Sequence, residues 1–157
     1  MRVLDNGSLE LDGIDKIILN SLMNDAKTPI AKIAKDVGVS STAIHQRIKK
    51  LETTKLIDST KVYINPKKLG FNTISFIGVY LDKSSSYKTV ISELEKINEI
   101  LESYYTTGNY SIFIKVNCRD NEHLMHILNH RIQEITGIVR TETFISLEQS
   151  INRQVKL

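Results

Sequence analysis

The stretch IAKIAKDVGVSSTAIHQRIKKL, residues 30–51, decides the fold of the N-terminal half. Apolar residues at 30, 33, 34 and 37 follow the helical period and stop at Gly38, and a second helical series at 44, 48 and 51 follows Ser40. Thr28 before Pro29 is a typical helix start, as is Ser40 for the second series. The three residues 38–40 therefore predict a tight turn between two helices, as in a helix-turn-helix.

A further helix is predicted upstream of this pair. Asp12 can cap it, Asp15 adds a negative charge to its first turn, and apolar residues follow at 14, 17, 18 and 22. Together the three helices predict an N-terminal helix-turn-helix domain of winged type over residues 1–55.

The outward face of the third helix carries polar and basic residues of the kinds that read DNA. Glutamine can bond bidentately to adenine, Ser and Thr can bond bases or phosphates, and Lys and Arg can neutralise phosphates. The candidate DNA-binding residues are Ser40, Ser41, Thr42, His45, Gln46, Arg47, Lys49 and Lys50.

Charge along the chain favours the DNA-binding interpretation over a merely solvated helix face. Residues 1–70 carry 12 Lys or Arg against 8 Asp or Glu, whereas residues 71–157 carry 9 against 10. The net charge of +3 thus comes from the first half, as expected of a basic nucleic-acid-binding half joined to a near-neutral one, although a few solvated lysines would also produce it.

The second half of the chain is predicted to be an α+β domain. From Leu56 the apolar period changes to two, so that residues 56–71 are predicted to form a stranded linker before a domain over 72–157. The expected order in that domain is strand 73–81, helix 86–98, strand 101–107, strand 110–118, helix 121–136 and strand 139–148. This order is the ferredoxin-like βαββαβ unit.

Apolar residues are expected on both faces of the predicted sheet. Ile77, Val79, Phe113 and Val139 indicate this, whereas the two helices of such a unit cover one face only. A homodimer is the simplest way to cover the other face.

Residues 104–116, YYTTGNYSIFIKV, join the two central strands through a small polar segment. Gly-Asn is favourable turn chemistry, so a plain hairpin turn is one interpretation of residues 107–109. The other is a place where a small molecule docks against bare backbone, because glycine admits a ligand close to an N–H group. The residues alone leave both open.

The chain resembles the Lrp/AsnC family of feast-or-famine regulators, and its AsnC branch most of all. The segments that carry the resemblance are LDGIDKIILNSL, AKIAKDVGVSSTAIHQRIKKLE, LIDSTKVYINPKKLG, YYTTGNYSIFIKV and GIVRTETFISLE. The resemblance implies a regulator that binds double-stranded DNA and has a C-terminal RAM-type domain. It also implies homodimers that assemble into octamers or similar rings, and an amino-acid effector. One departure is Lys55, where the family commonly has Gly, so this lysine is expected to adopt a left-handed conformation.

The same resemblance implies that the effector binds around the loop between the two central strands. The candidate effector-binding residues are Tyr105, Thr107, Gly108, Asn109, Tyr110 and Ser111, with Thr141 and Thr143 as secondary candidates. Many family members have Asp in place of Ser111, a natural partner for an ammonium group. The AsnC branch resembles this chain in having Tyr-Ser there, which implies asparagine as the effector.

Other function classes find little support in the sequence. No Walker loop, GxGxxG, nucleophile elbow or pair of CxxC motifs is present, and the three histidines of the last helix fit a polar flank, so we expect no catalytic residues, metal or cofactor. The single cysteine, Cys118, is interpreted as a small apolar residue. The N-terminus resembles no signal peptide and no apolar run spans a membrane, which predicts a cytoplasmic protein. The alternative function is a ferredoxin-like sensor or enzyme without DNA binding.

Overall fold

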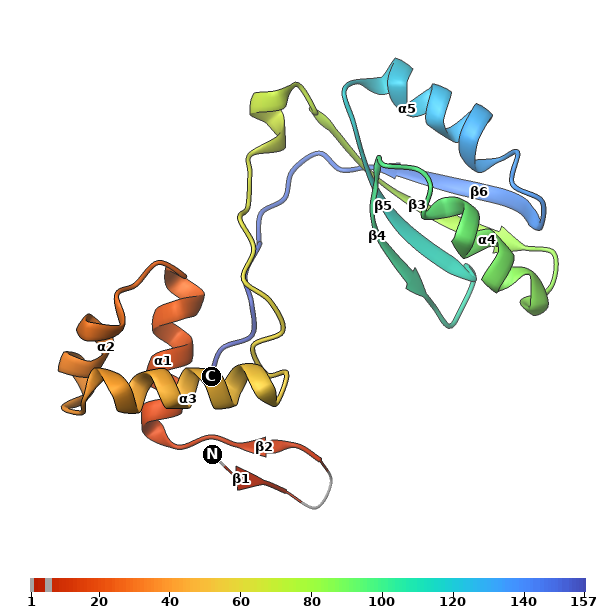
Figure 1. Ribbon diagram of the computed structural model, residues 1–157. Coiled ribbons are helices and arrows are strands. Elements are labelled where there is room, and N and C mark those ends of the chain that lie inside the picture. The colour runs from red at the N-terminus through yellow and green to blue at the C-terminus, as the bar shows by residue number, and fades with distance from the viewer. Residues whose placement is uncertain (1, 5–6) are drawn as a thin grey trace. The chain divides into compact units, whose positions relative to one another are not determined.

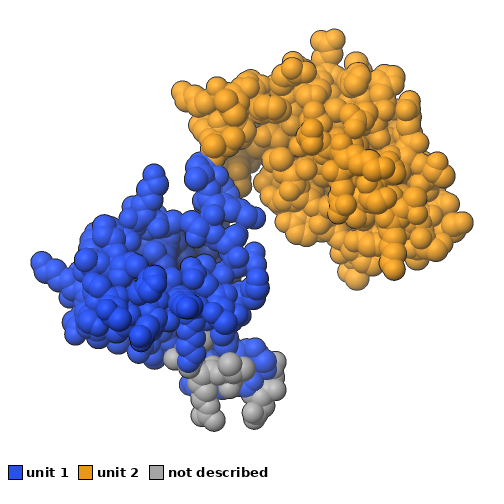
Figure 2. All heavy atoms as spheres, in the orientation of Figure 1, with its two compact units in different colours: residues 1–63, 152–157 blue, residues 64–151 orange. Residues whose placement is uncertain are grey.

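A computed structural model describes residues 2–4 and 7–157 of the chain. The chain divides into two compact units (Figure 2), residues 1–63 with 152–157 and residues 64–151. The division falls inside the segment predicted as the linker, and residues 152–157 join the first unit instead of the C-terminal domain in which the sequence placed them. The functional boundaries 1–55, 56–71 and 72–157 stay a prediction.

Three helices form the body of the N-terminal unit (Figure 1): α1 (Gly13–Asn24), α2 (Ile30–Val37) and α3 (Ser41–Thr53). Their apolar stripes meet in one core of buried side chains, Ile18, Leu19, Ile33, Ala34, Ile44 and Leu51. Residues 38–40 join α2 to α3, and Gly38 has the left-handed conformation that ends α2. The predicted helix-turn-helix is confirmed.

The helix starts agree with the prediction at α1 and α3 and differ at α2. Asp12 and Ser40 cap α1 and α3 with their side chains. Thr28 does not cap α2, because Pro29 is extended and α2 begins only at Ile30. The Thr28 hydroxyl instead donates to the carbonyl of Asp25 at 2.7 Å.

The strands of this unit also differ from the prediction. β1 (Arg2–Val3) and β2 (Leu9–Glu10) pair antiparallel before α1. Residues 54–65 contain no strand, although the sequence predicts a stranded linker there. The physical reason is the lack of a neighbouring strand: Val62 and Tyr63 are 86% and 85% exposed. Lys55 adopts the expected left-handed conformation, with φ of 59°.

The C-terminal unit is an antiparallel sheet with two helices. Its elements are β3 (Thr73–Leu81), α4 (Tyr87–Leu94), β4 (Ile100–Tyr105), β5 (Ile112–Cys118), α5 (Asn121–Ile127) and β6 (Ile138–Ile145). The strand order is β4-β5-β3-β6, and every neighbouring pair is antiparallel. This confirms the predicted ferredoxin-like βαββαβ fold. Both helices are shorter than predicted, and a π-turn over Leu128–Ile132 continues α5.

Both helices of this unit lie on the same face of the sheet (Figure 1). The core between them is aliphatic, and Ile77, Val79, Ile114 and Val116 are fully buried in it. Side chains that alternate with these lie on the other face. We call that face the aromatic face, and its rings are Phe76, Tyr80, Tyr104, Tyr110, Phe113 and Phe144. Within the described residues, no helix is both long and apolar enough to cross a membrane.

Candidate DNA-binding and effector sites

The candidate DNA-binding side chains lie on one exposed side of α3. Seven of the eight predicted residues are exposed: Ser40, Ser41, Thr42, His45, Gln46, Lys49 and Lys50. The core residues Ile44 and Leu51 hold the opposite side of the helix against α1 and α2. A buried stripe of this kind presents the polar side to solvent as a firm surface, which base reading requires.

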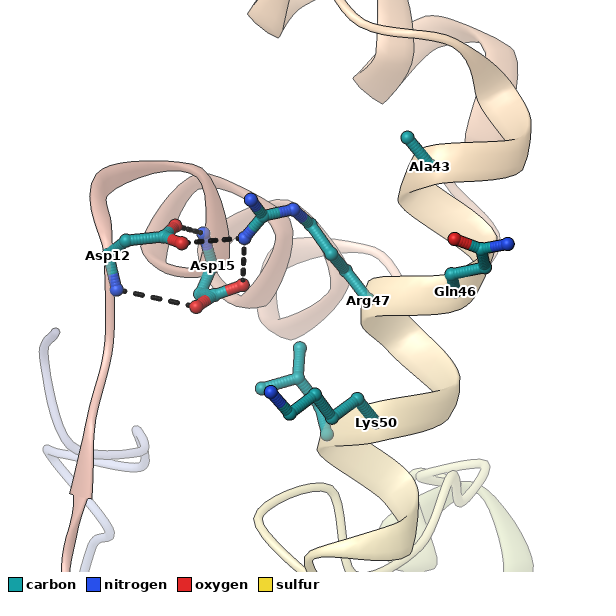
Figure 3. A pocket seen from close by; sticks show the side chains of 7 residues that line it. Asp12, Asp15, Ala43, Gln46, Arg47 and Lys50 are labelled. Atoms are coloured by element: carbon teal, nitrogen blue, oxygen red, sulfur yellow. Dashed lines mark hydrogen bonds and ion pairs between the residues drawn. The ribbon is translucent and has the colours of Figure 1, made fainter. Parts of the chain in front are cut away.

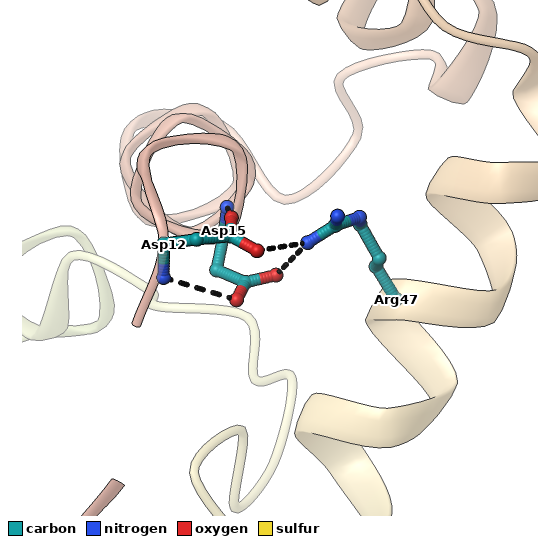
Figure 4. A network of polar contacts seen from close by, with 3 residues as sticks. All are labelled: Asp12, Asp15 and Arg47. Carbon is teal, nitrogen blue, oxygen red and sulfur yellow. Dashed lines mark hydrogen bonds and ion pairs between the residues drawn. The ribbon is translucent and has the colours of Figure 1, made fainter. Parts of the chain in front are cut away.

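Arg47 is the exception, because it is only partly exposed and its side chain points toward Asp12 and Asp15 (Figure 4). Its Nη1 atom lies 2.7 Å from Oδ2 of Asp12 and 2.7 Å from Oδ1 of Asp15. The sequence predicts Arg47 as a phosphate-neutralising residue, and in the structure its guanidinium makes two ion pairs. The signal was present in the spacing: Arg47 follows Ile44 by three residues and precedes Leu51 by four, which puts it beside the core.

The two aspartates also cap α1, each through its second oxygen. The N–H of Asp15 donates to Oδ1 of Asp12 at 2.9 Å, and the N–H of Asp12 donates to Oδ2 of Asp15 at 3.3 Å. Arg47 therefore binds the outer oxygens of a capping box. Its guanidinium holds the pKa of the Asp12 carboxyl well below the usual range, and the two carboxylates raise the pKa of Arg47.

A surface hollow of about 330 Å³ lies between this cluster and α3 (Figure 3). Its lining residues are Asp12, Asp15, Ala43, Gln46, Arg47, Lys50 and Leu51. In Figure 3, Arg47 reaches toward the two aspartates, whereas Gln46 points away from them. The helix thus turns one polar side chain outward and the adjacent one inward.

The loop between β4 and β5 is held at its base and open at its tip. The N–H of Thr106 donates to the carbonyl of Ser111 at 3.1 Å, and the N–H of Ser111 donates to the carbonyl of Val79 at 3.0 Å. Gly108 at the tip has φ of 111°, and no atom outside residues 107–109 lies within 4 Å of the position that a Cβ would take. In the part of the chain that the structure describes, no hydrogen bond uses the N–H of Gly108 or Asn109. These donors could bind a carboxylate.

The structure separates the two tyrosines that were expected to wall one pocket. Tyr105 lies on the helix-covered face, where its ring is 4.4 Å from that of Tyr87. Tyr110 lies on the aromatic face, so the sheet stands between them. Thr107, Gly108, Asn109 and Ser111 are the candidates that stay together at the loop.

The secondary candidates Thr141 and Thr143 are on β6 and do not reach the loop within this chain. Thr141 pairs with Val79, so β3 separates it from β5 by two strand spacings, roughly 10 Å. Its hydroxyl accepts a hydrogen bond from Nε2 of Gln133 at 2.8 Å.

Tyr110 connects the loop to the aromatic face through contacts that the sequence did not indicate. Its ring lies where a side chain of residue 78 would be, since a Cβ on Gly78 would be 2.4 Å from the ring. Its hydroxyl donates to Glu142 at 2.8 Å, and that of Tyr80 donates to the same carboxylate at 3.0 Å. The first of these bonds raises the pKa of Tyr110 and lowers that of Glu142. Gly78 and Glu142 can be recognised only once the strands are in register.

The remaining reactive groups form no site in the described residues. No group of three or more His, Cys, Asp or Glu side chains there could hold a metal ion. His126 of α5 and His130 of the π-turn that follows it are exposed neighbours, with ring centroids 5.1 Å apart. Cys118 is fully buried, and burial raises the pKa of its thiol to about 11. The thiol is therefore protonated near neutral pH.

Comparison with known proteins identifies both units. The profile of the Lrp/AsnC ligand binding domain matches residues 74–155, and that of the AsnC-type helix-turn-helix domain matches residues 11–52. The chain belongs to the Lrp/AsnC family. The "Regulatory protein AsnC" of Escherichia coli K12 is 42% identical over 146 residues, which are 93% of this chain and 96% of that protein.

Solved structures of Lrp/AsnC proteins agree with the fold. Escherichia coli AsnC superimposes with a TM-score of 0.91 at 41% identity, over 95% of this chain and all of that one. A feast or famine regulatory protein from M. tuberculosis, complexed with L-methionine, has a TM-score of 0.85 at 26% identity, over 94% of this chain and all of that one. The homologues named above are regulators. This Lrp/AsnC chain thus has a helix-turn-helix domain and a ligand-binding domain.

Proposed function

We propose that the chain is a sequence-specific DNA-binding transcriptional regulator of amino-acid metabolism. The observation that carries the proposal is the exposed row of Ser40, Ser41, Thr42, His45, Gln46, Lys49 and Lys50 on α3, in a unit that matches the AsnC-type helix-turn-helix. Such a helix enters the major groove and presents its side chains to base edges. With DNA as its partner, the protein acts in the cytoplasm.

The α3 row is tested by replacing Gln46 and Lys49 with alanine in the full-length chain. The probe is a duplex selected from a random pool by the unaltered chain, and binding is measured by fluorescence anisotropy at several salt concentrations. Loss of the Gln46 contact is expected to weaken specific binding by about 5- to 150-fold, the value of one good base contact. Loss of Lys49 is expected to reduce the salt slope by about 0.9.

Lys88→Ala is the matched control for these variants, because Lys88 is an exposed helix lysine in the other unit. It is expected to leave affinity and salt slope unchanged. The proposal would be contradicted if substitution of Gln46, Lys49 and Lys88 changed DNA affinity equally. It would also be contradicted if the unaltered chain showed no salt-dependent binding.

We further propose that the effector is a small amino acid, asparagine, bound at the loop of Thr107, Gly108, Asn109 and Ser111. Support comes from the open N–H groups at the loop tip and from the short side chains, which both donate and accept hydrogen bonds. The side-chain amide of asparagine needs a donor and an acceptor together. The methionine complex of the related M. tuberculosis regulator is a precedent for a free amino acid as ligand.

Isothermal titration calorimetry of the full-length chain tests the effector. Asparagine is expected to bind more tightly than aspartate or methionine, and Asn109→Ala is expected to weaken it about tenfold, as one lost polar contact would. Asn129→Ala serves as the control, because Asn129 is an exposed asparagine outside the loop of residues 107–111. Tightest binding of another amino acid would replace asparagine in the proposal, and no binding of any would remove the effector site.

The aromatic face supports a homodimer, and family resemblance supports assembly of dimers into an octamer or similar ring. Phe144 and Tyr104 are about half exposed in the single chain. Two ion pairs border the rings: Lys115 pairs with Glu102 at 2.9 Å, and Arg140 pairs with Glu142. Aromatic residues inside a charged rim are typical of protein interfaces, and a two-fold axis would pair this face with itself. In this proposal the effector favours one assembly over another through its differential affinity.

A further inference from the structure

Arg47 is less exposed than the other basic residues of α3. Lys49 and Lys50 are exposed, whereas the Arg47 side chain is 33% exposed and binds two carboxylates at 2.7 Å. The side chain of Asp15 is only 2% exposed. The charges of Arg47, Asp12 and Asp15 sum to −1, so the positive charge of Arg47 is balanced by the two carboxylates that it binds.

Arg47 cannot turn to a DNA phosphate without a loss inside the protein. It would break the bonds of Arg47 to Oδ1 of the buried Asp15 and to Oδ2 of Asp12. Removing one partner of a buried, charged hydrogen bond is costly because the remaining charge has no water to replace it. The pairing with the acids therefore competes directly with phosphate binding.

The same bonds also fix the direction of the base-reading side chains. Neighbouring residues of a helix point about 100° apart, so anchoring Arg47 fixes where the adjacent Gln46 points. The anchor is the first turn of α1, whose backbone is held by the capping box of Asp12 and Asp15. The bonds of Arg47 thus add to the core contacts that hold α3 in one rotation against α1.

We propose that Arg47 is a positioning residue that locks α3 against the first turn of α1 and makes no contact with DNA phosphate, because Asp12 and Asp15 retain it. This inference rests on the proposed DNA-binding function. It assigns the phosphate contacts of α3 to Lys49 and Lys50 and gives Asp12 and Asp15 a role in DNA binding although they are acidic.

Salt dependence distinguishes positioning from phosphate contact. Arg47→Gln in the full-length chain is expected to lower the ratio of selected-duplex to random-duplex affinity about tenfold, roughly one misplaced base contact, with the salt slope unchanged. Arg47→Lys keeps a cation beside Asp12 and Asp15, so its ratio of selected-duplex to random-duplex affinity is expected to be close to that of the unaltered chain. Lys49→Ala is the matched control, since it should reduce the slope by about 0.9 on both duplexes.

Replacing the two aspartates tests whether they keep Arg47 from binding DNA phosphate. Asp12→Asn with Asp15→Asn keeps the shape of the capping box but releases Arg47, since asparagine also caps helices. The salt slope is then expected to steepen by about 0.9, with tighter binding to random DNA. Adding Arg47→Gln to this pair should return the slope to that of the unaltered chain.

Nitrogen-15 NMR of the arginine side chains tests the proposal in the unaltered chain, so the result does not depend on whether a substituted chain folds. The Arg47 guanidinium signals are expected to stay in place when the selected duplex is added, because its partners do not change. A shift of these signals, or a slope that falls by about 0.9 in Arg47→Gln, would overturn the assignment while leaving DNA binding intact. Failure of the unaltered chain to bind DNA would overturn the proposed function and this inference with it.

Discussion

Ile44→Ala is expected to unfold the N-terminal unit at a much lower temperature and leave the C-terminal unit folded. Ile44 is fully buried, and the core around it has only five other buried apolar side chains among the described residues. Cutting a buried isoleucine to alanine costs about 2–5 kcal/mol, because transfer free energy is lost and a cavity remains. A small unit has only a few kcal/mol to lose.

The two units can be followed separately in one thermal scan. Five of the six tyrosines lie in residues 64–151, so near-ultraviolet circular dichroism reports mainly on that unit. The longest helices lie in the other unit and dominate the signal at 222 nm. Ile44→Ala should shift only the 222 nm transition, with loss of DNA binding at the assay temperature.

His45→Ala is the matched control for this prediction. His45 adjoins Ile44 but is exposed, so its truncation should change stability by less than about 0.5 kcal/mol. Equal shifts of both optical signals in Ile44→Ala would show that the units unfold as one and would contradict the prediction.

Gly78→Ala is expected to force the Tyr110 ring off the aromatic face. The new methyl group would stand 2.4–2.6 Å from three atoms of the ring, closer than carbon atoms approach. Movement of the ring would break the 2.8 Å bond to Glu142 and the contact with the Tyr80 ring, whose centroid is 5.3 Å away. Overpacking of this kind costs about 1–3 kcal/mol. The measurement is urea unfolding followed by tyrosine circular dichroism.

A double-mutant cycle separates the clash from other effects of the substitution. Tyr110→Ala removes the ring, so Gly78→Ala should then cost far less than in the unaltered chain, and the two changes should be strongly non-additive. Gly13→Ala is the control, because nothing lies within 4 Å of its added Cβ and it should be neutral or stabilising. Additive effects of Gly78→Ala and Tyr110→Ala would contradict the close approach seen here.

Local sequence signals predicted the elements well where one residue decides the outcome. Asp12 and Ser40 cap their helices as expected, Gly38 ends α2, and Lys55 adopts a left-handed conformation. Capping and handedness depend on a few neighbouring atoms, so they can be inferred from the sequence. The linker could not, because a strand needs a partner, and β-propensity in residues 56–65 does not supply one.

The sequence by itself determined the helix-turn-helix, the βαββαβ order and the polar row on α3, because helical and strand periods depend only on residue spacing. Only the tertiary structure decided which side chains meet across elements. It placed Arg47 in ion pairs with Asp12 and Asp15, and it placed Tyr105 and Tyr110 on opposite faces of the sheet. Such contacts follow from helix packing and strand register, which join residues far apart in the chain, so local spacing can place a side chain beside the core but does not identify its partner.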